Sequence, residues 1–226
     1  MNKVIEAKEL IKNYDTNGII VPVINGISME VMEGEFLAIT GISGSGKSTL
    51  LYLLSGIETP CSGEIYIEGK ELSKLKEKEI ARMRRQDISF VYQFYNLIPN
   101  LTIIENIVLS KRIDCKLEDE DKIYLEELIN LAGISHIRNR KPSEVSGGEQ
   151  QRVALIRAVF TKPKVIFLDE PTGNLDSKSS KMVMDLIMNI NKTYKTTLIM
   201  VTHSLEQAKQ ADRIITLRDG VIIQDN

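Results

Sequence analysis

The segment 41–49 constrains the fold of this chain more than any other. It reads GISGSGKST, follows the apolar run 36–40 and leads into the predicted apolar helix 48–55, with which it shares residues 48 and 49. This is the GxxxxGK(S/T) pattern in the strand–loop–helix context that the pattern requires. The glycines let backbone N–H groups turn inward towards phosphate oxygens, and the following helix adds the positive end of its dipole. The segment therefore predicts a phosphate-binding loop, since a chance glycine-rich turn with a lysine would rarely match both flanks.

The order of the predicted elements favours an α/β fold. Residues 5–14 and 24–31 are predicted strands separated by a polar turn at 15–18, and a C-terminal hairpin over 214–223 turns at 219–220. The other predicted strands are 36–40, 65–67, 88–92, 165–168 and 197–201, and the predicted helices are 48–55, 71–85, 102–137, 148–160, 179–194 and 205–210. Strands that alternate with helices imply a mostly parallel sheet.

Length and charge limit the class of protein. The 226 residues fit one domain, and 29 basic against 31 acidic residues give a formal net charge of −2. This balance gives no general attraction to nucleic acid or anionic lipid, so we expect no nucleic-acid partner and no direct membrane insertion. No segment approaches the ~20 apolar residues of a spanning helix, which predicts a soluble chain. Cys61 and Cys115 lack metal-ligand spacing and are expected to be reduced, with a disulfide or redox role as the alternative.

Two acidic residues follow the apolar strand 165–168. Ligands of open α/β sheets bind at the carboxyl ends of the strands. There Asp169 would hold Mg²⁺, and Glu170 would polarise an attacking water as a general base. In the loop, Lys47 would supply charge to the β- and γ-phosphates, and Ser48 a hydroxyl to Mg²⁺. An acidic pair after a strand is more often a helix-capping turn, but the phosphate loop reverses that preference.

Residues 145–152, VSGGEQQR, resemble the LSGGQ signature of ABC ATPases, which combine it with a phosphate loop. Val145 replaces the usual Leu and Glu149 the usual first Gln. Both changes are mild, because the chemistry rests on Ser146 and on the backbone at Gly147 and Gly148. Alone, a Ser-Gly-Gly run would be an ordinary helix N-cap. The resemblance implies the P-loop ABC ATPase fold, with a mostly parallel central sheet, an antiparallel β subdomain and a helical subdomain.

The resemblance covers essentially the whole chain, because further motifs follow in the family's order. Tyr14 would stack on adenine, an ordinary strand-end tyrosine being the alternative. Gln93 resembles the glutamine that senses Mg²⁺ and the γ-phosphate. Asp176 ends a D-loop pattern, Asn-Leu-Asp, and His203 resembles the switch histidine that contacts the γ-phosphate. The other histidine, His136, is expected at the surface.

These motifs imply one domain, ATP and Mg²⁺ as cofactors, and three overlapping sets of site residues. Within the domain, 1–92 and 163–226 would form the core with its β subdomain, and 93–162 the helical subdomain with the signature. Catalytic roles are implied for Lys47, Gln93, Glu170 and His203, and metal binding for Ser48, Gln93 and Asp169. Nucleotide contacts are implied for Tyr14, Gly41, Ser43, Gly44, Ser45, Gly46, Lys47, Ser48, Thr49, Gln93, Ser146, Gly147, Gly148, Glu149, Asp176 and His203.

A second copy of the chain is an implied partner. Lys47 and Ser146 belong to different parts of the predicted fold, so one nucleotide cannot easily touch both within one chain. The resemblance implies a head-to-tail dimer, in which ATP on one phosphate loop is covered by Ser146 and Gly148 of the other copy.

Residues 94–102, FYNLIPNLT, narrow the resemblance to the branch of macrolide exporters, lipoprotein-release motors and antimicrobial-peptide resistance transporters. In that branch the ATPase pairs with a separate membrane permease. This implies a cytoplasmic subunit held at the inner face of the membrane through residues 93–101. The apolar side chains at 94, 95, 97 and 98 suit a docking patch, or alternatively a local core beneath the loop.

Two other functions stay open at this point. The branch implies export or extraction of a peptide, lipid or drug-like substrate, but a cell-division or mechanotransmission ATPase shares its motifs and acts on a permease-like partner without transport. A nucleotide-binding regulator without catalysis is disfavoured, because Glu170 and His203 are both present.

Overall fold

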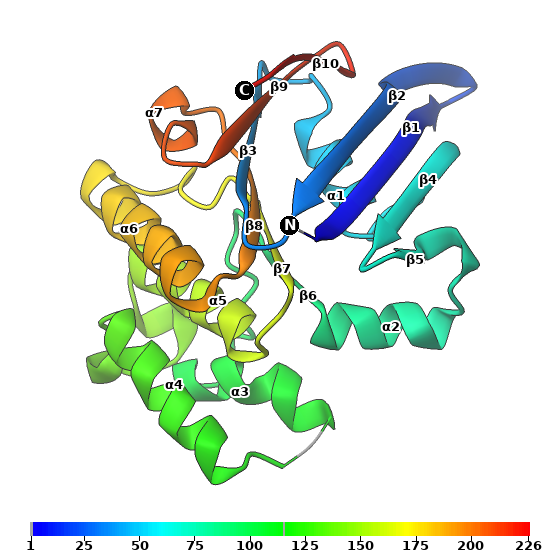
Figure 1. Cartoon of the computed structure of the whole chain (residues 1–226). Helices are drawn as coiled ribbons and strands as arrows, with labels where there is room; N and C mark the ends of the chain where they lie inside the picture. The colour runs from blue at the N-terminus through cyan, green and yellow to red at the C-terminus, as the bar shows by residue number, and fades with distance from the viewer. Residues whose placement is uncertain (1, 115) are drawn as a thin grey trace.

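The computed structural model describes residues 2–114 and 116–226, so the expectation for Cys115 falls outside the described residues. Within them, the centre of the protein is a six-stranded sheet in the order β10-β9-β3-β8-β7-β6 (Figure 1). Its strands are β3 (Phe36–Gly41), β6 (Ile88–Val91), β7 (Val165–Asp169), β8 (Thr197–Val201), β9 (Arg213–Arg218) and β10 (Val221–Asp225). All neighbours pair in parallel except β10, which is antiparallel to β9. The predicted mostly parallel sheet is confirmed.

The strands of this sheet are apolar throughout because both faces are covered. Successive side chains of a strand point to opposite faces. Phe36 and Ala38 accordingly join a core against the helices, whereas Leu37 and Ile39 join the core on the other face. All five residues of β7 are buried, as a strand covered on both sides requires.

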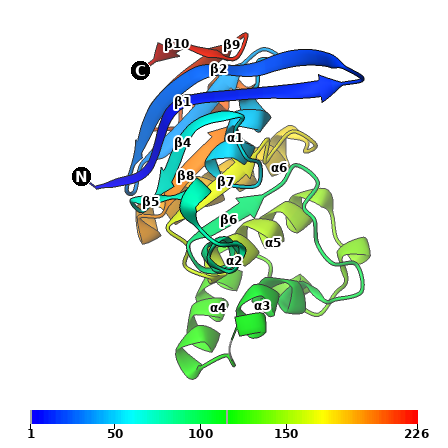
Figure 2. The same ribbon diagram turned by 90° about the vertical axis from the view of Figure 1, so that its right-hand side faces the viewer.

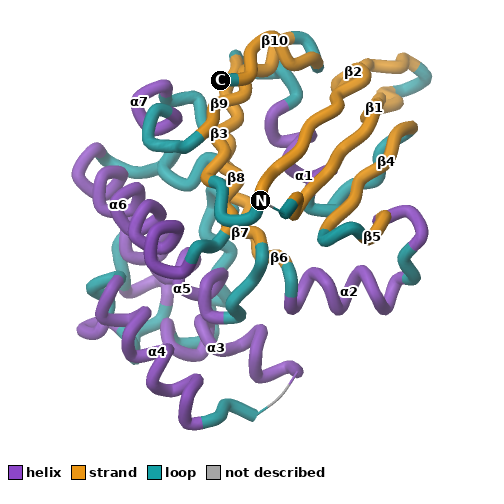
Figure 3. The backbone as a smooth tube through the Cα atoms, viewed as in Figure 1, coloured by secondary structure: helices purple, strands orange, loops and turns teal. Residues whose placement is uncertain are grey.

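Helices cover one face of the sheet (Figures 1 and 3). These are α3 (Ile103–Asp114), α4 (Asp119–Leu131), α5 (Gly147–Phe160) and α6 (Ser177–Tyr194), with the single-turn α7 (Leu205–Ala208) in contact with β3. The core beneath them contains Phe160 from α5 and Ile187 from α6, both essentially without solvent exposure. Each such fully buried side chain contributes about 1.5–3 kcal/mol to folding.

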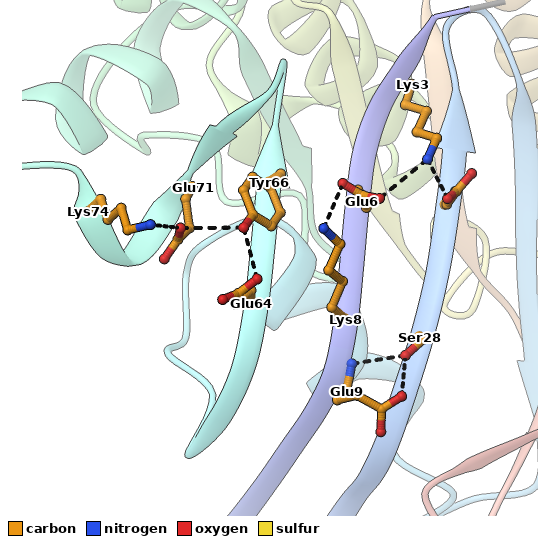
Figure 4. Close-up of polar contacts among 10 residues, drawn as sticks. Lys3, Glu6, Lys8, Glu9, Ser28, Glu64, Tyr66, Glu71 and Lys74 are labelled. Carbon is orange, nitrogen blue, oxygen red and sulfur yellow. Dashed lines mark hydrogen bonds and ion pairs between the residues drawn. The ribbon is translucent and has the colours of Figure 1, made fainter.

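The other face carries α1 (Lys47–Leu54) and a second, antiparallel sheet (Figure 2). That sheet has the order β2-β1-β4-β5 and contains β1 (Lys3–Thr16), β2 (Ile19–Met32), β4 (Ser62–Ile67) and β5 (Lys70–Glu71). Helix α1 contacts β2 on one side and β3, β7 and β8 on the other, which explains why Leu50, Leu51, Leu53 and Leu54 are all buried. The antiparallel sheet also carries polar side chains that pair with one another, such as Lys3 with Glu6 and Tyr66 with Glu64 (Figure 4).

Several boundaries differ from the sequence predictions for local reasons. The predicted helix 71–85 is a 3-10 turn (Leu72–Lys74) followed by α2 (Glu77–Gln86), because Lys76 is extended and its N–H donates to Glu79 at 2.8 Å. The helical stretch 102–137 is α3, α4 and a 3-10 turn (Ser135–Ile137). The first hairpin is longer than predicted, since a tight turn at Asn17 and Gly18, both with positive φ, joins strands that continue to its ends.

No helix among the described residues is long and apolar enough to cross a bilayer.

The packing of β4 against β1 generates a prediction. Gly63 has φ of +95°, and a Cβ there would lie 2.5 Å from the carbonyl oxygens of both Lys8 and Glu9. Gly63→Ala should lower the free energy of unfolding by about 2–4 kcal/mol, because left-handed strain adds to a backbone clash. Gly69→Ala is the matched control: φ is +71° with no atom within 4 Å of its Cβ, so it should cost about 1 kcal/mol. Urea unfolding measures both, and equal losses would contradict the close approach.

Candidate active site

The phosphate loop joins the end of β3 to the start of α1, and its backbone leaves no room for side chains at two positions. A Cβ at Gly41 would collide with the carbonyl of Leu217, and one at Gly46 would lie 2.7 Å from the carbonyl oxygen of Val23. The first turn of α1 has N–H groups without intrahelical partners. The Ser45 hydroxyl is buried and has no hydrogen-bond partner among the described residues. Spare donors in a glycine cradle fit an anionic phosphate group.

A hollow of about 540 Å³ opens over this loop. The buried Lys47 lies at its floor, where its ammonium donates to the carbonyl of Ile42 at 2.8 Å. The volume is typical of small-molecule sites. The hollow is lined by Tyr14, Val23, Ser43, Gly44, Gly46, Lys47, Ser48, Thr49, Glu170 and His203, so it gathers nine of the residues that the sequence singled out.

Asp169, the last residue of β7, does not line the hollow itself but is hydrogen-bonded to Ser48, which does. The Ser48 hydroxyl donates to its Oδ1 at 3.1 Å, and the Tyr52 hydroxyl donates to its Oδ2 at 2.8 Å. A carboxylate and a hydroxyl beside a phosphate cradle are the donors with which proteins hold Mg²⁺ on a substrate phosphate. Burial, and next the bond to Asp169, raise the pKa of Tyr52, so its hydroxyl stays protonated. Sequence reasoning missed Tyr52, although it lies four residues after Ser48 on the same helix face.

Three polar side chains from neighbouring strand ends meet at the mouth of the hollow. Glu170 has φ of +43°, and its Oε2 lies 3.3 Å from Nδ1 of the exposed His203. Gln93 follows β6. Its side chain lies close to that of Glu170, because a Cβ on Gly173 would be 3.1 Å from Gln93 Nε2 and also 3.1 Å from Glu170 Oε2. The Gln93 amide also lies 3.5 Å from Oδ1 of Asn174. The carboxyl ends of β6, β7 and β8 thus place an amide, a carboxylate and an imidazole together.

The signature residues lie outside this hollow, at the start of α5. Ser146 is exposed and caps α5 by accepting from the Glu149 N–H at 3.4 Å, while its own N–H and hydroxyl donate to Glu149 Oε2 at 2.9 and 2.7 Å. These hydrogen bonds, and next His136, lower the pKa of Glu149, whose charge suits a helix N-terminus. His136 is exposed, as expected, and lies 3.0 Å from Glu149.

Asp176 and Gly148 meet at one side chain of α6. Asp176 caps α6 by accepting from the N–H groups of Lys178 and Ser179, each at 3.0 Å, and from the Ser179 hydroxyl at 2.7 Å. A Cβ at Gly148 would lie 2.8 Å from that hydroxyl. The structure therefore joins the signature to the D-loop, but it brings neither to the phosphate loop of the same chain.

Arg157, on the same helix as the signature, is a second residue that sequence reasoning missed. Its guanidinium donates to the carbonyl oxygens of Asn96 at 2.6 Å and Tyr95 at 2.9 Å, and both of these residues have positive φ. A Cβ at Gly147 would lie 2.7 Å from the Tyr95 hydroxyl. The segment after Gln93 is thus hydrogen-bonded to α5 through Arg157 and lies close against it at Gly147.

A phosphate cradle, a strand-end carboxylate pair and a capped Ser-Gly-Gly turn define a P-loop nucleoside-triphosphatase. The family model described as ABC transporter matches residues 24–173. The chain is similar to the dimeric ATP-binding cassette MJ0796 in a post-hydrolysis state with ADP and Pi, at 35% identity and a TM-score of 0.89, over 98% of this chain and 97% of that one. A second dimeric structure of MJ0796, described as a bacterial ABC transporter cassette, gives 36% identity over the same shares of the two chains, with a TM-score of 0.89.

Another similar structure is cbiO1 from Clostridium perfringens, part of the ABC transporter complex cbiONQ. It is 27% identical with a TM-score of 0.87, over 100% of this chain and 89% of that one. The chain belongs to the ABC transporter family. It is an ABC-type ATPase, the ATP-binding cassette of a transporter.

The Arg157 contacts generate a prediction about the loop after Gln93. Arg157→Lys should raise amide hydrogen exchange over residues 94–98 about tenfold, because one ammonium cannot span two carbonyls. Arg138→Lys is the control, since it removes a forked pair with Glu126 at the surface and should leave this loop unchanged. Unaltered exchange in the Arg157 variant, measured by mass spectrometry, would show that the guanidinium does not hold the loop.

Proposed function

We propose that this chain is the ATP-hydrolysing motor subunit of an ABC transporter and couples closure of an ATP-bound dimer to a separate membrane permease. The observation that carries the proposal is that Lys47, Ser48, Glu170 and His203 line one hollow, with Asp169 hydrogen-bonded to Ser48 behind it. Ser146 is exposed elsewhere. The residues at the hollow can hold and hydrolyse a triphosphate. Ser146 can complete the same kind of site on another molecule.

The nucleotide lies along the hollow with its base at Tyr14 and its phosphates in the loop. The Tyr14 hydroxyl donates to Glu58 at 2.5 Å, and the Lys12 ammonium lies 5.1 Å from the centroid of its ring. The ring is therefore fixed, and it lines the hollow where a flat base can stack on it. The phosphates meet the backbone of 41–49, and the Ser45 hydroxyl gives the loop one more free donor.

Hydrolysis uses the groups at the mouth of the hollow. Glu170 orients water and accepts its proton, and the left-handed backbone at Glu170 is the kind of outlier found at active sites. Lys47 neutralises charge on the leaving phosphates, while Gln93 and His203 contact the γ-phosphate. Mg²⁺, held by Ser48 and Asp169 with Gln93 nearby, would supply further positive charge across the β- and γ-phosphates.

A second copy of the chain completes the site. The exposed Ser146 hydroxyl would exchange its bond to Glu149 for one to a phosphate oxygen, at the positive dipole end of α5. Gly147, Gly148 and Glu149 shape the turn, and Asp176 lies beside it. The MJ0796 cassettes are dimeric, one of them with ADP and Pi, which supports a pair of chains. In a two-fold pair the turn of each chain would cover the nucleotide of the other, so one contact would be made twice. A swing from 99:1 open to 1:99 needs about 5.5 kcal/mol. Two to four charge-assisted hydrogen bonds at about 1.5–3 kcal/mol each supply it.

The permease docks on residues 93–101, within the helical region 93–162. Phe94 and Ile98 are exposed, 72% and 41%, whereas Leu97 packs against the helical core. The first two form the docking pair, and Arg157 links their loop to α5. This contact would hold the chain at the cytoplasmic face of the membrane.

The transporter exports or extracts a peptide, lipid or drug-like molecule. The supporting observation is the sequence of 94–102, which resembles that of export and lipoprotein-release motors. A cell-division or mechanotransmission role without transport is the second candidate, favoured by the same segment.

Glu170→Gln tests the hydrolytic mechanism. The amide keeps the shape of the side chain but cannot accept a proton, so ATP should still bind while turnover falls about 10²–10⁴-fold. The variant should accumulate as a dimer with ATP and Mg²⁺, seen by analytical ultracentrifugation, because the closed pair no longer opens after hydrolysis. Glu120→Gln, on the exposed start of α4, is the control with unchanged turnover. Near-normal turnover in the Glu170 variant would remove that residue from its role.

A further inference from the structure

Helix α1 holds both oxygens of the Asp169 carboxylate from one face. Ser48 and Tyr52 are four residues apart, so their side chains lie next to each other on the helix surface. Ser48 donates to Oδ1 at 3.1 Å and Tyr52 to Oδ2 at 2.8 Å. The two oxygens of Asp169 therefore have different partners before any ligand arrives.

The Tyr52 ring is fixed by aromatic packing against β6. Its centroid lies 5.7 Å from that of Phe90, which in turn packs 4.4 Å from Tyr92 and 6.1 Å from the buried Phe167. Phe90 is also the register partner of Phe167 on β7, the strand that ends in Asp169. A movement of the Tyr52 ring away from Asp169 would therefore loosen its packing on Phe90, which lies on the strand next to β7.

The carboxylate needs this hydroxyl because its terminal torsion is soft. Rotation about χ2 of an aspartate is broad and nearly two-fold, so its oxygens are interchangeable unless a fixed donor selects one. The Ser48 hydroxyl is a shared group, since its oxygen is proposed to bind the metal through a lone pair while its proton is donated to Oδ1. The Tyr52 hydroxyl donates to the other oxygen, Oδ2, so its bond is separate from the metal contact proposed for Ser48.

We propose that Tyr52 is a positioning residue for the metal site: by holding Oδ2 it presents Oδ1 of Asp169 to the ion and its water shell. The inference rests on the proposed function, in which Ser48 and Asp169 hold Mg²⁺. Tyr52 does not line the nucleotide hollow, so its effect is confined to the metal and does not extend to the phosphate loop.

Tyr52→Phe removes the hydroxyl and keeps the ring against Phe90. Mn²⁺ serves as the probe, and its affinity for the protein saturated with ADP is measured by electron paramagnetic resonance. The dissociation constant should rise about tenfold, as the loss of a hydrogen bond to a charged group requires. Nucleotide affinity in EDTA should stay within about twofold, because the phosphate cradle is untouched.

Tyr66→Phe is the matched control, since it also removes a tyrosine hydroxyl that donates to a carboxylate at 2.8 Å, here Glu64 on the exposed sheet (Figure 4). It should leave Mn²⁺ affinity unchanged. In a chain that already carries Asp169→Ala, Tyr52→Phe should cause no further loss of Mn²⁺ affinity, because the two residues act through one hydrogen bond.

Three results would overturn the inference. The first is that Tyr52→Phe has the same Mn²⁺ affinity as Tyr66→Phe. The second is that the losses of Mn²⁺ affinity in Tyr52→Phe and Asp169→Ala add in the double variant, and the third is that Tyr52→Phe loses nucleotide affinity in EDTA as much as it loses Mn²⁺ affinity. Wild-type protein that gains no Mn²⁺ affinity on adding ADP would instead contradict the proposed metal site, and the inference with it.

Discussion

The hydrogen bond between Ser48 and Asp169 joins the phosphate loop to the centre of the parallel sheet, and the geometry of the site depends on it. Because β6, β7 and β8 are adjacent and parallel, their carboxyl ends lie about 4.8 Å apart, strand to strand. Gln93, Glu170 and His203 follow those ends. The parallel pairing of β6, β7 and β8 therefore sets the spacing of these three side chains at the mouth of the hollow. The double core on both faces of the sheet keeps this edge rigid.

A second constraint is that the signature and the phosphate loop of one chain do not meet. Helix α5 begins at the exposed Ser146 and carries Arg157, which holds the carbonyls after Gln93. Gly148 lies against Ser179, whose N–H and hydroxyl donate to Asp176. In the proposed dimer, a phosphate that draws Ser146 across to another chain would pull on the loop with Phe94 and on the start of α6. These contacts are contiguous, so they are the route by which the proposed coupling between ATP and a permease would travel.

The sequence predicts most of the fold and the floor of the site, because the signals there are local. The loop 41–49 has fixed glycine spacing, and the apolar strand 165–168 ends directly in its two acids. Tyr52 and Arg157 escape prediction because their partners lie 117 and 61 residues away. The stretch 102–137 reads as continuous helix because apolar spacing persists across the break between α3 and α4. The loop 94–98 has no periodicity, so the sequence cannot show that Phe94 is exposed while Leu97 is packed.

In the proposed dimer the nucleotide bound by one chain is covered by another, and γ-phosphate photolabelling tests this directly. A size-tagged Lys47→Ala chain, which cannot hold ATP on its own loop, is mixed with wild-type protein and an ATP analogue bearing an azide on the γ-phosphate. We predict that light attaches the label to the Lys47→Ala chain at the peptide containing Ser146, and only when the wild-type chain is present. Label found solely on the wild-type chain would contradict the shared site.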